Sequence, residues 1–377
     1  MTITITSYNA LCNLGNNIET IYQNAIEGNN SRYENIDNFL PNTILHAGII
    51  SSDLPEIKDE NFNIRANKIL LKNIELLKKD IEQIKNKYSS DKIGIVCAST
   101  NSGVQEYEKS KNPNHYELGN SADFLRKYLK LNGFYSTVST ACSSGIKAFS
   151  LARDLLNNNV CDAVIVACVD TLSKVPAFGF NSLEVLSDKT STPFSKNRLG
   201  MNISEASTIF ILEKNVQGIE ILGIGESTDI YHPTTPDPKG KEATNAINQA
   251  LKEAKLMPED IDYINAHGTG TIANDIMEAN AIWDVFKDKV PISSTKPLTG
   301  HCLGAAAGIE IALCTKLIDN FDGRLYPNIP YDNFDNSLPK INLVSKDATY
   351  KKCNICMCNS FGFGGTNAII ILGKNYE

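Results

Sequence analysis

Strands alternate with helices along the whole sequence, and this alternation restricts the possible folds more than any other feature. The strands expected in the first part are short apolar or alternating runs, at 2–6, 93–97, 163–169 and 207–212. Between them, 64–87 and 144–157 carry apolar residues at helical spacing. This pattern predicts an α/β protein built from layers, with mixed sheets.

The second part of the chain repeats the alternation. Strands are expected at 219–225, 261–265, 353–358 and 367–372, and helices at 241–255, 275–287 and 304–319, with a proline-rich loop at 233–238. No low-complexity tract or long linker interrupts the chain. We therefore expect two tightly packed halves, 1–215 and 216–377, that share a large core.

The charge balance limits the classes of partner. The 377 residues include 36 basic and 43 acidic side chains, a net charge of −7. This balance argues against nucleic acid as the main partner. It still allows an acidic protein partner, because a local basic patch is enough for docking.

Nothing in the sequence predicts a membrane or secreted location. No apolar run is long enough to cross a bilayer, and 1–6 alternates like a strand rather than forming a charged leader. The ten cysteines are scattered, mostly in apolar stretches, so a disulfide scaffold is not expected. Cys353, Cys356 and Cys358 lack the second paired motif of a structural zinc site and fit a buried strand. We expect a cytoplasmic protein without a metal.

Three motifs combine a reactive side chain with small neighbours. Ser139–Gly145 contains Cys142, Ala266–Thr271 contains His267, and Ser293–His301 contains Lys296 and His301. Small residues let a flexible thioester arm pass close to the backbone. Cys142 lies at an expected strand-to-helix junction, where a helix N-terminus is expected to lower its pKa below about 8.5. The pattern indicates acyl transfer to a thiol.

Together, these motifs resemble the β-ketoacyl-acyl-carrier-protein synthases, the elongating ketosynthases of the thiolase superfamily, over nearly the whole chain. The resemblance implies a thiolase-like fold, layered αβαβα, with two duplicated halves, although no identity between the halves is visible. It also implies a decarboxylative Claisen condensation. An acyl group on Cys142 reacts with malonyl-acyl-carrier protein to give a β-ketoacyl product that is two carbons longer.

The resemblance assigns roles to the reactive residues. His267 and His301 would donate hydrogen bonds, as neutral imidazoles, to the malonyl thioester carbonyl, and His301 would contact the Cys142 sulfur. Lys296 would support them, paired with Glu310 as its acidic partner.

Two further segments match the family pattern. Thr269 and Thr271 correspond to residues that bind the phosphopantetheine arm, whereas Asn274, Asp275 and Glu278 are expected to cap the following helix. The glycine-rich stretch 359–367 resembles the family's gating loop. Phe361 would stand between the acyl pocket and the nucleophile, and its backbone N–H would complete an oxyanion hole with Cys142.

Partners follow from the same resemblance. The substrates would arrive on the phosphopantetheine of acyl-carrier protein, so no other cofactor is expected. Arg65 and Lys68 are candidates for docking the carrier, although a solvated helix face explains them equally well. The protein would be a homodimer or a heterodimer with a subunit that resembles a chain-length factor.

Two departures from the family pattern indicate a specialised branch. In 195–206, Arg198 and Glu205 are retained, but the usual aspartates and the glycine of the family's Gly-Glu-Gly piece are missing. The segment 104–136 is also shorter than in elongation synthases of fatty acid synthesis. Polyene, including aryl polyene, and polyketide pathways therefore stay open beside fatty acid biosynthesis. A coenzyme-A-dependent thiolase-like enzyme lacks support, because the C-terminal cysteine motif of thiolases is absent. A chain-length factor would lack Cys142.

Overall fold

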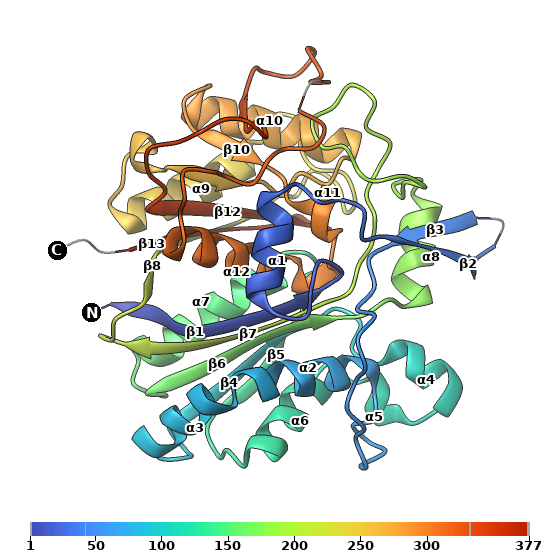
Figure 1. The fold of residues 1–377 in the computed structure, drawn as a ribbon, viewed down its shortest axis with the longest axis vertical. Helices are drawn as coiled ribbons and strands as arrows, with labels where there is room; N and C mark the ends of the chain where they lie inside the picture. Colours follow the sequence, from blue (N-terminus) through green and yellow to red (C-terminus); the bar gives the residue numbers. More distant parts are fainter. Residues whose placement is uncertain (1, 42, 332, 375–377) are drawn as a thin grey trace.

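The computed structural model, which describes residues 2–41, 43–331 and 333–374, has five layers in the order α-β-α-β-α (Figure 1). Helices α7 (Ser144–Asn157) and α12 (Ala306–Asp319) form the central layer between two groups of strands. One outer layer consists of α9 (Lys241–Ala254) and α10 (Ile272–Phe286). The other consists of α2 (Arg65–Leu76), α3 (Lys78–Lys87) and α6 (Asn120–Leu129).

The first group of strands has the order β5-β4-β6-β7-β1. Its members are β1 (Ile3–Cys12), β4 (Ile93–Ala98), β5 (Tyr135–Val138), β6 (Ala163–Asp170) and β7 (Ala206–Lys214). β4 runs parallel to β5 and β6, whereas β7 is antiparallel to both β6 and β1. All eight residues of β6 are buried, as expected for a central strand that is covered by helices on both faces.

The second group repeats this order and these directions as β10-β9-β12-β13-β8. Its members are β8 (Ile219–Thr228), β9 (Tyr263–Asn265), β10 (Pro291–Ser293), β12 (Ile355–Gly362) and β13 (Thr366–Gly373), with β11 (Asn342–Leu343) added beside β10. Among the described strands, the two groups pair where the start of β1 meets the start of β8. The predicted layered fold with two duplicated halves is confirmed, and residue 215 lies in the connection between β7 and β8.

The central helices approach each other closely. A β-carbon on Gly145 of α7 would lie 2.9 Å from the β-carbon of Ala307 and 3.0 Å from the backbone nitrogen of Gly308, both on α12. Nearly every residue of α12 is buried, because a helix between two sheets has no solvent face. Small residues therefore set the distance between the two halves.

The remaining elements are mostly surface features. They are α1 (Ile18–Ile26), β2 (Glu34–Leu40), β3 (Thr43–Ala47), α4 (Val104–Ser110), α5 (Pro113–Tyr116), α8 (Lys174–Ser182), α11 (Lys296–Thr299) and 3-10 turns at Pro258–Asp260 and Leu303–Ala305. The single helix expected at 64–87 is two helices, because the backbone leaves the helical conformation at Leu77. Within the described ranges, no helix has the length and apolar character that a membrane span requires.

Candidate active site

The four residues predicted to carry the chemistry meet at the ends of the central layer. Cys142 precedes the N-terminus of α7, and His267 follows β9. Lys296 is the first residue of α11, and His301 follows that helix. All four are at least 94% buried. The Cys142 Sγ lies 3.0 Å from His301 Nε2, and the two imidazole rings are 5.4 Å apart at nearly a right angle. The structure therefore joins three motifs that are far apart in the sequence.

Hydrogen bonds determine which imidazole nitrogen carries the proton. The backbone N–H of Leu303 donates to His301 Nδ1 at 3.2 Å, and Lys296 Nζ lies 3.4 Å from His267 Nδ1. Backbone amides and lysine ammonium groups only donate, so each Nδ1 is an acceptor and each Nε2 carries hydrogen. Burial and the charge of Lys296 hold the pKa of both histidines well below the usual 6.5. The pair is neutral and presents two N–H donors.

The same cluster has the spacing of a metal site. One ligand atom from each of Cys142, His267 and His301 lies within 4.8 Å of the others. A metal ion, however, needs lone pairs on the imidazole nitrogens that face it. Here both Nε2 atoms carry hydrogen, so the arrangement suits a developing negative charge on a substrate oxygen better than a cation.

These histidines should make stability depend on pH. The unfolded chain binds protons on them near pH 6.5 and the folded chain does not, so the free energy of unfolding should fall as pH drops below 6.5. Each histidine contributes up to about 1.4 kcal/mol per pH unit. Burial raises the pKa of Glu310 and Asp275 to about 7. These two groups therefore increase the free energy of unfolding as pH falls from about 7 to 4.5, opposite to the effect of the histidines.

Comparison of variants isolates the histidine contribution. Urea unfolding between pH 5.5 and 7.5 should lose less stability on acidification when His267 and His301 are both glutamine than in the unmodified protein. The exposed His232 changed to glutamine is the matched control and should leave the slope unchanged. An equal slope in the double variant would contradict the expected depression of these pKa values.

Lys296 and Glu310 form an ion pair that is almost completely buried. Glu310 lies in the second turn of α12, and Lys296 begins α11, so the pair ties the histidine loop to the central layer. Burial raises the pKa of Glu310, although the charge of Lys296 lowers it. Because the ammonium also contacts His267 Nδ1, it connects α12 to one catalytic imidazole.

The pKa of the Cys142 thiol differs from the sequence-based expectation. Burial raises this pKa to about 11, although Lys296 and backbone N–H groups lower it. The net direction, set by burial, is opposite to the decrease expected from the sequence. Ala141 immediately before it has φ +53°, a left-handed conformation that is strained for a non-glycine residue and typical of functional sites.

The loop residue whose backbone N–H faces the Cys142 thiol is Phe363, whereas Phe361 was expected there. The backbone N–H groups of Phe363 and of Cys142 itself both act to lower the pKa of the Cys142 thiol. Phe361 belongs to β12, where it pairs with Asn367, and its ring contacts the imidazole of His267. A signal for this was present in the sequence. Gly364 and Gly365 both have positive φ, so the turn follows Phe363 and places it at the tip of the loop.

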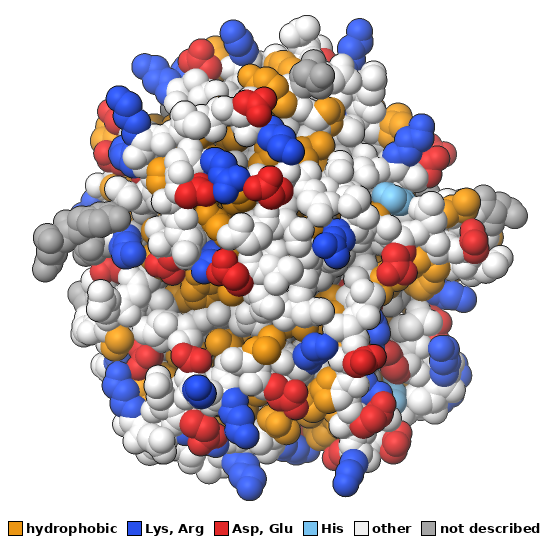
Figure 2. Space-filling model, in the orientation of Figure 1, with side chains coloured by type: hydrophobic (Ala, Val, Ile, Leu, Met, Phe, Trp, Pro, Cys, Tyr) orange, Lys and Arg blue, Asp and Glu red, His pale blue; other side chains and the backbone are white. Residues whose placement is uncertain are grey.

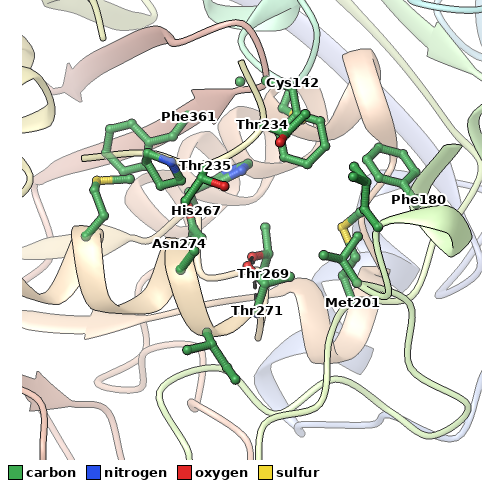
Figure 3. A pocket seen from close by; sticks show the side chains of 18 of the residues that line it. Cys142, Phe180, Met201, Thr234, Thr235, His267, Thr269, Thr271, Asn274 and Phe361 are labelled. Carbon is green, nitrogen blue, oxygen red and sulfur yellow. Dashed lines mark hydrogen bonds between the residues drawn. The ribbon is translucent and has the colours of Figure 1, made fainter. Parts of the chain in front are cut away.

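Two cavities meet at the thiol. One, of about 390 Å³, is lined by Cys142, both histidines, Thr269, Thr271 and Met201 (Figure 3). The hydroxyls of Thr269 and Thr271 lie 2.9 Å apart at its wall. The other cavity, of about 350 Å³, is mainly apolar. Besides Cys142, its lining includes Thr100, Asn101, Val104, Tyr116, Leu118, Val175, Pro176 and Leu303. Phe363 and Phe180 line both cavities, and their rings pack against each other. Phe363 therefore lies between the cavities, in the place expected for Phe361.

Two carboxylates support the His267 loop instead of capping α10. Glu278 accepts hydrogen bonds from the backbone N–H groups of His267 and Gly268 at 2.8 and 2.7 Å. Asp275 accepts from Gly270 N in the same loop at 3.2 Å and from Phe194 N at 2.7 Å. Helix α10 begins at Ile272, three residues before the expected start, so both carboxylates lie inside it and face the loop. The expected capping role is wrong.

The altered segment 195–206 holds His301 through its backbone. His301 N donates to Asn202 O at 2.7 Å, and Ser204 N donates to His301 O at 3.0 Å. Arg198 pairs with Asp335 at 2.6 Å, in the wall of the first cavity. The sequence contains no local signal for these contacts, because they join residues about 100 positions apart.

Arg65 forms an ion pair within the chain, so docking stays a prediction for this residue. Its guanidinium makes two 2.7 Å bonds to the buried carboxylate of Glu205, and it also donates to Ile50 O. Lys68 is on the surface and pairs with the exposed Glu56, so docking stays a prediction for it. On the face of the molecule seen in Figure 2, basic and acidic side chains are interspersed rather than gathered into one basic patch.

Two family models match this chain. The beta-ketoacyl synthase N-terminal domain matches 86–217, and the beta-ketoacyl synthase C-terminal domain matches 219–330. A 3-oxoacyl-[acyl-carrier-protein] synthase 2 from Synechocystis is 31% identical over 329 residues, which cover 78% of this chain and 78% of that protein. The chain belongs to the β-ketoacyl synthase family. The predicted resemblance is confirmed.

Other β-ketoacyl synthase relatives align over a shorter part. The 3-oxoacyl-[acyl-carrier-protein] synthase 2 of Coxiella burnetii is 34% identical over 66% of this chain, and nodulation protein E of Rhizobium leguminosarum is 34% identical over 66%. These alignments span 63% and 64% of the relatives, slightly less than two thirds of their length.

Solved structures have the same ketosynthase fold. A chain from the complex of the ketosynthase ApeO with its chain length factor ApeC, from Xenorhabdus doucetiae, gives a TM-score of 0.94 at 36% identity. The match covers 99% of this chain and 98% of that one. The ishigamide ketosynthase/chain length factor gives 0.90 at 23% identity, which supports the fold alone.

Proposed function

We propose that this β-ketoacyl synthase catalyses decarboxylative Claisen condensation between an acyl group on Cys142 and malonyl-acyl-carrier protein. One observation carries the proposal. A buried thiol lies where two cavities meet, and two neutral imidazoles present Nε2–H donors beside it.

The first half-reaction is acyl transfer to the thiol. The Cys142 sulfur attacks the thioester carbonyl, a new carbon–sulfur bond forms, and the bond to the carrier sulfur breaks. The thiol proton leaves with the carrier as its free thiol. The N–H groups of Cys142 and Phe363 hold the oxyanion, and a preorganised donor of this kind contributes about 2.7–4 kcal/mol.

The second half-reaction forms the carbon–carbon bond. The malonyl thioester oxygen accepts hydrogen bonds from Nε2 of His267 and His301 while the bond to the carboxylate breaks and carbon dioxide leaves. The electron pair enters the resulting enolate, whose carbon attacks the acyl-Cys142 carbonyl. The β-ketoacyl carrier protein departs, and the cysteine thiolate takes a proton from solvent. Neutral imidazoles suit this step, because they donate hydrogen bonds to the enolate oxygen but carry no positive charge that would stabilise the malonyl carboxylate before it leaves as carbon dioxide.

Substrate delivery would use the first cavity. Thr269 and Thr271 line its wall and would bind the phosphopantetheine arm, and the apolar second cavity would receive the acyl chain. The reaction as proposed requires no resident cofactor or metal. A cytoplasmic location agrees with ten cysteines that are all free.

Acylation of the purified protein tests the activity. Incubation with a panel of acyl-carrier proteins should add the mass of the acyl group to Cys142, and malonyl-carrier protein should then give a product two carbons longer. Coenzyme A thioesters are the comparison substrates. Acylation from coenzyme A alone would favour a thiolase-like condensing enzyme, and no acylation from any donor would refute the proposal.

The second part of the proposal concerns the subunit with which this protein assembles. We propose a heterodimer with a chain-length-factor-like subunit rather than a homodimer, because the 36% identical neighbour comes from such a complex. Pathways that make polyenes or polyketides then become more plausible than fatty acid synthesis. Mixing the pure protein with a candidate partner should form a one-to-one complex and fix the product length. A stable homodimer that elongates alone would refute the heterodimer.

A further inference from the structure

Asp170 is a buried carboxylate that the proposed reaction does not use. It ends β6 and has no exposed surface. Its oxygens accept hydrogen bonds from Gly304 N at 2.7 Å, and from Thr100 through both the backbone N–H and the hydroxyl. Ser99 Oγ and Asn101 N donate to it as well. Among the described residues no lysine, arginine or histidine forms a salt bridge with it.

The bond to Gly304 connects this carboxylate to His301. Leu303, the preceding residue, has φ +53° and donates its N–H to His301 Nδ1. That conformation is strained for a leucine and persists only when its surroundings hold it. Position 304 must be glycine for this contact, because a β-carbon there would lie 2.8 Å from the Asp170 carboxylate.

We propose that Asp170 is a positioning residue that selects the tautomer of His301. The carboxylate anchors Gly304, the anchored turn holds Leu303 in its strained conformation, and the Leu303 N–H keeps Nδ1 free of hydrogen. Without the anchor the turn relaxes, the proton moves to Nδ1, and Nε2 faces Cys142 as an acceptor. The consequence for catalysis rests on the proposed function, but the tautomer does not.

Nitrogen NMR of protein labelled with ¹⁵N-histidine tests the tautomer directly. The His301 signal, identified by its absence from a His301→Gln sample, should show a protonated Nε2 in the unmodified protein. Asp170→Asn and Gly304→Ala should each shift it toward the Nδ1–H form. Thr100→Val removes one donor to the same carboxylate but leaves the Gly304 bond, so it is the matched control and should match the unmodified protein.

The decarboxylation rate is the second readout. For Asp170→Asn we expect kcat to fall about 10- to 100-fold, which is no more than the decrease expected when one hydrogen-bond donor is lost. The KM for malonyl-carrier protein should stay within about twofold. If Asp170→Asn does not fold, Gly304→Ala carries the test. The proposal is overturned if the unmodified protein has Nδ1–H at His301, if a folded Asp170→Asn or Gly304→Ala keeps the original tautomer, or if Thr100→Val shifts it. Absence of condensation in the unmodified protein would refute the proposed function and leave the NMR result standing.

Discussion

Replacing Cys142 with alanine should abolish acyl transfer and chain elongation while decarboxylation of malonyl-carrier protein remains measurable. The sulfur is the atom on which the acyl group is carried, so its removal should reduce elongation by at least about 10³-fold. Both Nε2–H donors stay in place, because Lys296 and Leu303 hold His267 and His301 independently of the thiol. Mass spectrometry follows acylation, and carbon dioxide release follows decarboxylation.

Cys161→Ala is the matched control for this substitution. Cys161 is also buried, but it lies before β6, outside both cavities. That variant should acylate and elongate like the unmodified protein. An alanine variant at 142 that still extended an acyl chain would show that another residue is the nucleophile.

Replacing either catalytic histidine with alanine should slow malonyl decarboxylation by about 10²- to 10³-fold, which corresponds to the loss of one preorganised donor. The two variants should differ in acylation. His301 Nε2 lies 3.0 Å from the Cys142 sulfur, so His301→Ala should also slow acyl transfer. His267 is held by Lys296 and Glu278, and His267→Ala should leave acylation close to normal.

His115→Gln provides the comparison for these two variants. His115 is buried as well, but it bonds Ser110 and Glu60 at the surface segment around α5. Its substitution should leave both half-reactions unchanged. Equal loss of acylation in the His267 and His301 variants would contradict the separate roles given to the two rings.

Several parts of this structure could be predicted from the sequence alone. Cys142, both histidines and Lys296 could be proposed from short motifs of small residues, and Glu310 from its place in the family pattern. The structure brings these five side chains together. The strand and helix alternation was sufficient for the layered fold. The ends of α7 were predicted to the residue, since an apolar stripe begins directly after the cysteine motif.

The errors have a common physical origin in contacts between distant residues. The sequence predicts a free surface charge at Arg65, but in the structure its guanidinium pairs with Glu205, which lies 140 positions away. Asp275 and Glu278 read as helix caps until the fold turns them toward the His267 loop. The thiol pKa depends on burial by both halves, which no local pattern reports. Phe361 and Phe363 differ only in their place relative to the turn.

The duplicated strand order has a mechanical consequence for the thiol and its imidazole. Cys142 precedes α7 in one half, and His301 precedes α12 at the same topological position in the other. The gap between sulfur and nitrogen is therefore a distance between two helix starts, and the close approach at Gly145 sets it. A side chain at position 145 would push α7 and α12 apart and so increase the distance between Cys142 Sγ and His301 Nε2. The alignment of these two atoms thus depends on how closely the two repeats pack against each other.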